Sequence, residues 1–187
     1  MIDDEKYLRV TEVLSPFSGL NKIDQNILKN AAQRGERVHL ACEAIIKNLS
    51  YFPDPDYPED ENYIKSFQTW LIGKKNPQIL PRLFCDQFMI KGLCDMVYED
   101  HRGLVLVDWK TPIKESKTWL LQGSAYSYLA KKNGYPIQAI EFVKLSKIGK
   151  PPVTYLYEEN FYLFQCHLEA YRYSFKDSKP EIDTDYL

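Results

Sequence analysis

Residues 92–110 read Gly-Leu-Cys-Asp-Met-Val-Tyr-Glu-Asp-His-Arg-Gly-Leu-Val-Leu-Val-Asp-Trp-Lys, and this stretch decides the fold. Two β-prone runs flank Asp100-His101-Arg102-Gly103, which is typical of a tight turn, so the stretch predicts a β-hairpin. Symmetric pairing about that turn places Asp95 opposite Asp108, whether the loop has two residues or four. The two acids therefore share one face of the predicted sheet.

Asp95 and Asp108 form a pair of like charges at directly opposed positions. Opposed side chains in an antiparallel pair have Cβ atoms about 4.5–5.5 Å apart, where like charges destabilise a sheet. A hard divalent cation held by both carboxylates would offset this repulsion. Lys110 projects from the same face because it follows Asp108 by two residues. The combination indicates phosphodiester hydrolysis; the alternative is a shifted register in which both acids face solvent.

Two helical pairs extend this candidate site. His39 and Glu43 are four residues apart at the shoulder of an apolar stripe, so both can face a neighbouring sheet, and the imidazole is placed to meet a metal. The alternative is a surface His–Glu pair. Gln122 and Tyr126 show the same spacing on a later helix. The alternative interpretation of this pair is an ordinary helix–sheet contact in which Gln122 forms a hydrogen bond with the tyrosine hydroxyl.

The order of periodic segments predicts an α/β fold with a mixed central β-sheet flanked by helices. We expect helices over 11–14, 26–34, 38–49 and 59–72, with Gly35 breaking the helical pattern between the second and the third. Three consecutive strands follow at 80–91, 92–99 and 103–109. A helix over 116–132, strands over 136–146 and 152–157, and a helix over 158–175 complete the predicted domain, 1–175. Residues 176–187 are expected to be a polar carboxyl-terminal tail.

The composition favours one compact globular domain of 187 residues with a formal net charge of −2. A chain of that charge has no general basic surface for nucleic acid, so any such binding needs local cations. Apolar runs fall far short of the roughly 20 residues that span a bilayer. The acidic start, Met1 to Lys6, is unlike a secretory signal. We therefore expect no membrane partner and a cytoplasmic location.

The motifs Gly35-x-x-x-His39-x-x-x-Glu43, Gly92-Leu93-Cys94-Asp95, Val107-Asp108-Trp109-Lys110 and Gln122-x-x-x-Tyr126 occur in this order. Together they resemble the PD-(D/E)XK nuclease superfamily, in its RecB-type branch. The opening Arg9-Val10-Thr11-Glu12-Val13-Leu14 looks like the start of small phage-type exonucleases of that branch. The resemblance covers most of the chain and implies a restriction-endonuclease-like core.

The resemblance also implies a role for each matching residue. It makes His39, Asp95, Asp108 and the main-chain carbonyl of Trp109 the metal ligands. Lys110 then orients or deprotonates the attacking water. Gln122 and Tyr126 support the catalytic site and contact DNA, and Glu43 lies beside the site. Mg²⁺ is the expected metal, with Mn²⁺ also compatible with an imidazole among oxygen ligands.

Some related nucleases hold an iron–sulfur cluster with one early cysteine and three near the carboxyl terminus. Here only Cys166 of the four cysteines lies in that terminal region, so no such cluster is expected. A DNA-binding groove would need basic residues that flank the motifs, and the candidates are Arg34, Arg37, Lys114, Lys117, Lys131 and Lys132. An ordinary solvated helix face is the alternative for each of them.

Two functional hypotheses follow. The first is a metal-dependent deoxyribonuclease, more specifically an exonuclease of phage or bacterial DNA recombination or repair. The second is a catalytically silent nuclease-fold module that binds DNA or serves in assembly. The resemblance leaves room for a homo-oligomer and for phage recombination or replication proteins as partners.

Overall fold

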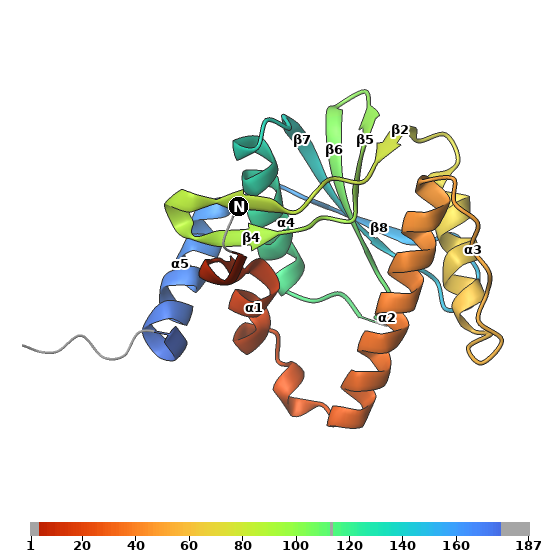
Figure 1. The fold of residues 1–187 in the computed structure, drawn as a ribbon, viewed down its shortest axis with the longest axis horizontal. Coiled ribbons are helices and arrows are strands. Elements are labelled where there is room, and N and C mark those ends of the chain that lie inside the picture. Colours follow the sequence, from red (N-terminus) through yellow and green to blue (C-terminus); the bar gives the residue numbers. More distant parts are fainter. Residues whose placement is uncertain (1–3, 113, 177–187) are drawn as a thin grey trace, which may run out of the picture.

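The computed structural model describes residues 4–112 and 114–176 (Figure 1). The predicted tail lies outside these residues from 177 onward, as does the start of the acidic amino-terminal segment. The helices are α1 (Val10–Leu14), α2 (Gln25–Ile46), α3 (Asp60–Leu71), α4 (Thr118–Lys132) and α5 (Phe161–Tyr171), with short 3-10 turns η1 (Asp4–Lys6), η2 (Ser15–Phe17), η3 (Leu20–Lys22) and η4 (Asp86–Phe88) and a final π-helical turn η5 (Arg172–Lys176). The strands are β1 (Leu8–Arg9), β2 (Lys75–Gln78), β3 (Leu83–Cys85), β4 (Ile90–Gly92), β5 (Met96–Asp100), β6 (Gly103–Lys110), β7 (Ile137–Lys144) and β8 (Val153–Tyr157).

The main sheet has five strands in the order β2-β5-β6-β7-β8. Strands β6 and β7 run parallel, and the other neighbours are antiparallel, so the sheet is mixed. The predicted hairpin is confirmed as β5–β6, with Met96 opposite Val107 and Asp100 opposite Gly103. Asp95 and Asp108 are the next residues beyond the pair Met96–Val107, at the open end of the hairpin.

Helices cover both faces of this sheet (Figure 1). On one face, Val38 and Cys42 of α2 and Phe67 of α3 pack with the sheet in a buried cluster. On the other face, α1, α4 and α5 form a larger cluster with alternate residues of the same strands. Burial on both faces explains the nearly continuous apolar run of β6. The α/β prediction with helices flanking a mixed sheet is confirmed.

A second, three-stranded sheet lies beside α4, with the order β1-β4-β3. The predicted continuous strand over 80–91 is wrong, because β3 and β4 are separated by η4 and by Met89, whose φ of 44° turns the chain back. Strand β2 was not predicted. It contains Pro77 and lies at the edge of the main sheet, where a missing backbone donor is tolerated.

Helix α2 is continuous from Gln25 to Ile46, so the prediction that Gly35 interrupts it is wrong. The carboxylate of Asp24 caps its start by accepting hydrogen bonds from the amides of Asn26 and Ile27. Glycine weakens a helix interior by only about 1 kcal/mol, which the buried side of α2 outweighs. A single rigid element therefore carries His39.

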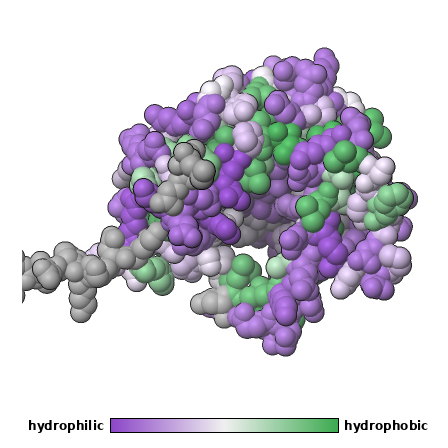
Figure 2. Space-filling model, viewed as in Figure 1, coloured by the Kyte–Doolittle hydropathy of each residue, from purple (hydrophilic) through white to green (hydrophobic). Residues whose placement is uncertain are grey.

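The surface in the same view is mostly hydrophilic, with smaller apolar patches, and it is hollowed beside α2 (Figure 2). No helix in the described part of the chain has the length and apolar character needed to cross a membrane.

Candidate active site

Asp95 lies immediately before β5, one position beyond the pair Met96–Val107. Its Oδ2 accepts a hydrogen bond of 2.7 Å from the backbone amide of Trp109, the residue that follows Asp108. The hairpin therefore brings the Asp95 carboxylate to the chain segment that carries the second acid, as the register predicted.

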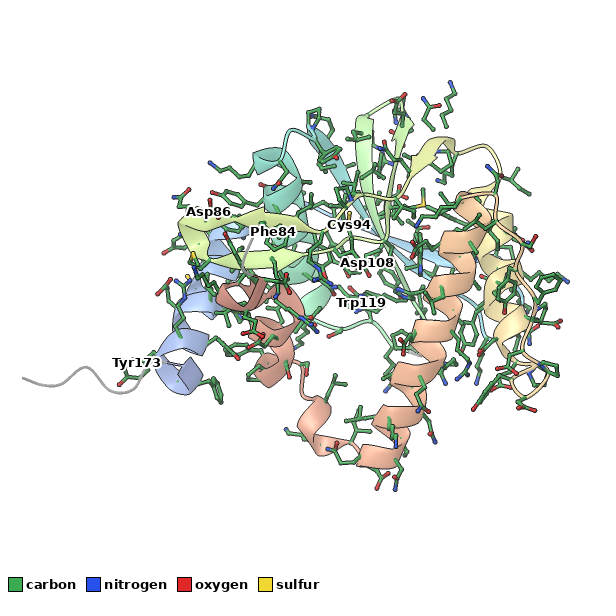
Figure 3. The ribbon with its side chains drawn as sticks, in the orientation of Figure 1. Phe84, Asp86, Cys94, Asp108, Trp119 and Tyr173 are labelled. Carbon is green, nitrogen blue, oxygen red and sulfur yellow. The ribbon has the colours of Figure 1, made fainter. Side chains whose placement is uncertain are left out.

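Asp108 is buried near the end of β6, with its side chain 3% exposed. Its Oδ2 lies 2.6 Å from Nζ of Lys110, which projects from the same face of the strand. Burial raises the pKa of Asp108 to about 6; Asp95 adds to this rise, while Lys110 opposes it. Figure 3 shows Asp108 near Cys94, in the middle of the molecule. An ionised carboxylate here gains free energy from any cation that approaches it.

His39 reaches the hairpin from α2. Its Nδ1 lies 3.0 Å from Oδ1 of Asp95, and its ring packs edge-on against Trp109, with centroids 5.7 Å apart. Burial lowers the pKa of His39, but the charges of Asp95 and Asp108 together outweigh this and leave it above its usual range. The structure thus places His39 in contact with Asp95 and within the electrostatic influence of Asp108, because α2 packs its Val38 and Cys42 side into the core.

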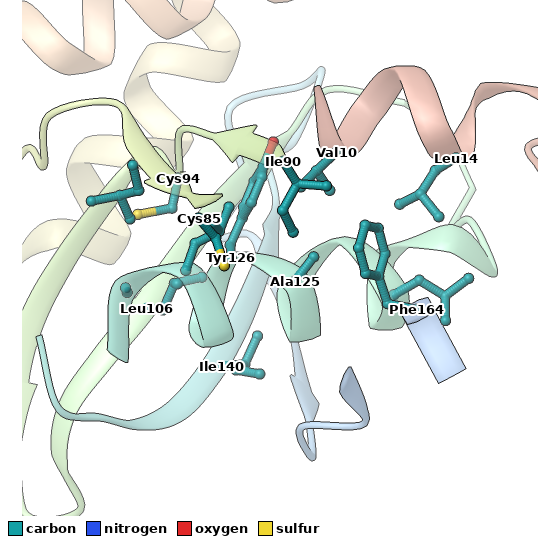
Figure 4. Packing of buried hydrophobic residues seen from close by; sticks show 14 of the residues in the cluster. Val10, Leu14, Cys85, Ile90, Cys94, Leu106, Ala125, Tyr126, Ile140 and Phe164 are labelled. Atoms are coloured by element: carbon teal, nitrogen blue, oxygen red, sulfur yellow. The ribbon is translucent and has the colours of Figure 1, made fainter. Parts of the chain in front are cut away.

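Gln122 links α4 to the same group. Its Oε1 accepts a hydrogen bond of 3.1 Å from Lys110, and its Nε2 donates to Asp108 at 3.3 Å and to the Tyr126 hydroxyl at 3.1 Å. Burial raises the pKa of Tyr126. Figure 4 shows Tyr126 reaching from α4 toward Ile90 and Val10. Gln122 therefore contacts Lys110 and Asp108 by direct hydrogen bonds, and Tyr126 accepts one from Gln122.

A pocket of about 380 Å³ opens between α2 and the hairpin, and we call it the acidic pocket. It is lined by Ala32, Gly35, Glu36, His39, Leu40, Glu43, Ile79, Leu93, Cys94, Asp95 and Trp109. Glu43 lies on its wall, as predicted, with its carboxylate paired to Lys47 one helical turn later. The predicted ligands His39, Asp95 and Trp109 all border this space. Sequence reasoning missed Leu40 and Leu93, whose exposed apolar side chains carry no chemical signature.

Arg34 and Arg37 lie elsewhere on α2. The Arg37 Nε is 2.6 Å from Oδ2 of Asp60, and its guanidinium stacks over the Tyr57 ring at 3.5 Å. The Arg34 guanidinium lies 5.6 Å from the ring of Tyr63 in α3. Neither arginine lines the acidic pocket, because both contact α3 or the segment before it. Their role in DNA binding stays a prediction.

Within residues 4–112 and 114–176, no three His, Cys, Asp or Glu side chains are grouped closely enough to form a ready metal-binding cluster. His39 and Asp95 contact each other, while Asp108 is turned toward Lys110. The donors nevertheless suit a hard divalent cation chemically, because two carboxylates, an imidazole and a main-chain carbonyl come from adjoining positions. With neutral His39, the two acids and Lys110 sum to a formal charge of −1.

No protein-family model and no curated protein matches the chain. A solved structure described as SSO0001 superposes with a TM-score of 0.48 at 13% sequence identity, over 95% of this chain and 80% of that chain.

Proposed function

We propose that this chain is a divalent-metal-dependent deoxyribonuclease of the PD-(D/E)XK type, in the RecB-type branch, with a restriction-endonuclease-like core. One observation carries the proposal: two ion pairs, His39 with Asp95 and Lys110 with Asp108, lie at the open end of one hairpin, where Asp95 also binds the backbone amide of the residue after Asp108. The motifs that resemble this superfamily are those that supply these four side chains.

In this proposal the metal is held by His39, Asp95, Asp108 and the carbonyl of Trp109. A bound Mg²⁺ or Mn²⁺ supplies Lewis-acid activation of water and stabilises the charge that develops on the phosphate. The two aspartates provide the negative charge that holds the cation. The buried position of Asp108 strengthens this attraction, since little water screens it.

Lys110 acts on the attacking water in the proposed mechanism. Its ammonium lies between Asp108 and Gln122, two acceptors that fix its direction, at 2.6 and 3.1 Å. An ammonium held in this way can orient a water molecule by donating a hydrogen bond to it, and once it has given up its own proton the resulting amine can accept one from that water. Gln122 in turn is held by Tyr126, so α4 limits how far the lysine can move.

The preferred substrate class is DNA, with digestion from ends, as the resemblance to small phage-type exonucleases implies. The acidic pocket is the space beside the candidate site that would admit a strand. The proposed setting is phage or bacterial recombination or repair, in the cytoplasm, with phage recombination or replication proteins or further copies of this chain as partners.

The test is cleavage of labelled single- and double-stranded DNA with Mg²⁺, Mn²⁺ or a chelator. We expect metal-dependent cleavage by the natural sequence. Lys110→Ala should lower the rate at least about 100-fold while leaving DNA affinity nearly unchanged, because its ammonium acts on the reacting water. The matched control is Lys75→Ala, which removes an exposed lysine from the edge strand β2.

Asp108→Ala should also abolish cleavage, so activity that survives both this variant and chelator is a contaminant and contradicts the proposal. DNA binding without cleavage in the presence of either metal also contradicts the proposed nuclease activity. That result favours the second hypothesis, a catalytically silent nuclease-fold module that binds DNA or serves in assembly.

A further inference from the structure

A second pocket adjoins the acidic pocket and has the opposite charge. It measures about 170 Å³ and is lined by Arg9, Val10, Thr11, Arg82, Lys91, Gly92, Leu93 and Tyr126. We call it the basic pocket. Three of its lining residues are cationic and none of them is acidic, whereas the acidic pocket is lined by Glu36, Glu43 and Asp95. In a chain of net charge −2, this separation of charge is a local feature.

The backbone brings two of these cations together. Strands β1 and β4 pair in parallel, with Arg9 directly beside Lys91. Like charges at neighbouring positions on a ladder destabilise a sheet unless a counter-charge lies nearby. Lys91 is 5% exposed, and such a buried ammonium needs a partner.

Asp4 supplies part of that counter-charge. Its Oδ2 lies 2.8 Å from Nζ of Lys91, and its Oδ1 lies 3.3 Å from the Arg82 guanidinium. One carboxylate thus serves two of the three cations. Among residues 4–112 and 114–176, no carboxylate forms an ion pair with the Arg9 side chain, although Glu12 accepts a hydrogen bond of 3.4 Å from the Arg9 backbone amide. With Asp4 and Glu12 set against the three cations, the described residues leave an excess of one positive charge at the basic pocket.

Two residues connect the basic pocket to the candidate active site. Leu93 lines both pockets, so they lie on either side of its side chain. Tyr126 lines the basic pocket and also binds Gln122, which contacts Asp108 and Lys110. A Cβ added at Gly92 would lie 2.7 Å from the Tyr126 ring, so the absence of a side chain there lets the tyrosine approach β4.

We propose that the basic pocket is a phosphate-binding subsite, in which Arg9, with Lys91 and Arg82 behind it, receives one phosphate of a nucleic-acid strand. This inference rests on the proposed function. A neighbouring phosphodiester of the same strand then lies across Leu93, at Asp95 and Asp108. Arginine suits this role because its planar donors match phosphate oxygens. The phosphate is either an internal diester or the monoester at a strand end, and both present the same anionic oxygens.

The test measures binding in chelator, so that it does not depend on cleavage. Fluorescence anisotropy compares labelled single strands carrying a 5′-phosphate with matched strands carrying a 5′-hydroxyl. We expect Arg9→Ala to weaken binding about tenfold, with a decrease of about 1 in the slope of log affinity against log salt. Arg9→Lys should restore part of the loss, because the charge returns without the planar donors. Lys75→Ala is the matched control.

Equal loss for both strands in Arg9→Ala assigns the pocket to an internal diester, and loss confined to the phosphorylated strand assigns it to an end. Either result supports the subsite. Arg9→Ala that binds like Lys75→Ala overturns it, as does the absence of binding by the natural sequence. Cleavage with Mn²⁺ is scored separately. If the natural sequence cleaves DNA but Arg9→Ala binds DNA normally, only the proposed subsite is contradicted. If the natural sequence does not cleave DNA but Arg9→Ala binds DNA weakly, only the proposed nuclease function is contradicted.

Discussion

At the scale of single residues, the important feature is that Asp108 is a buried acid with one nearby cationic partner. The carboxylate contacts Lys110 and Gln122, and its pKa is raised to about 6 from an ordinary value of 3.8 by burial first and by Asp95 second. The folded protein therefore holds this proton to a higher pH than the unfolded chain does. The free energy of unfolding of the metal-free protein therefore decreases as the pH rises from about 4 to about 6 and Asp108 ionises.

Asp108→Asn should therefore stabilise the metal-free protein above pH 6 and have little such effect near pH 4. The amide has a similar shape and carries no charge to desolvate. We expect a rise of several degrees in Tm at pH 7.5, measured by thermal unfolding in chelator across this pH range. Asp56→Asn, in an exposed loop, is the control and should change Tm little at any pH. A lower Tm for Asp108→Asn at pH 7.5 would contradict the prediction.

At the scale of elements, two glycines inside helices have opposite surroundings. A Cβ added at Gly35 of α2 would meet only Oγ1 of Thr111, at an ordinary 3.8 Å. A Cβ added at Gly123 of α4 would lie 2.7 Å from Ile140 and 2.8 Å from Phe142 on β7. Gly123 thus allows α4 to pack closely on the sheet, while Gly35 has no comparable packing role.

Gly35→Ala should raise the free energy of unfolding by about 0.5–1 kcal/mol, because alanine restricts the unfolded chain and favours the helix. Gly123→Ala should lower it by about 1–3 kcal/mol, since the added methyl overpacks the contact between α4 and β7. Urea unfolding of the two variants provides the comparison, each serving as the control for the other. A rise for both variants would show that helix propensity alone governs these positions, and a fall for Gly35→Ala would contradict the prediction.

At the scale of the whole molecule, the candidate site joins elements from both sides of the main sheet. His39 comes from α2 on one side, Gln122 and Tyr126 come from α4 on the other, and the β5–β6 hairpin lies between them. A ligand bound by α2 and the hairpin together stabilises the folded state, because the unfolded chain does not keep these groups close.

Mn²⁺ should therefore raise the Tm of the natural sequence. At about 100 times its Kd, the cation contributes about 2.7 kcal/mol, equivalent to roughly 5–10 °C for a chain of this size. Asp95→Asn should remove most of the shift, and His39→Ala should reduce it by weakening metal binding. Asp56→Asn should keep the full shift. An unchanged shift in Asp95→Asn and His39→Ala would show that Mn²⁺ binds elsewhere.

Much of the fold was predictable from local patterns. The register of the hairpin follows from its turn and from the alternation of its strands, so the pairing from Asp100–Gly103 up to Met96–Val107, next to the two acids, was predicted correctly. Helix α3 and helix α4 also lie close to their predicted ranges. The small sheet was not predicted, because strands of two or three residues show no periodicity.

The sequence by itself determined which side chains share a strand or helix face, because side-chain direction repeats every two residues in a strand and every 3.6 in a helix. Only the tertiary structure decided which faces meet. It turned Arg37 toward Asp60, placed His39 against Asp95, and set Arg9 beside Lys91 across two short strands. These contacts join residues far apart in the chain, and they depend on how helices and sheets pack, which local periodicity does not specify.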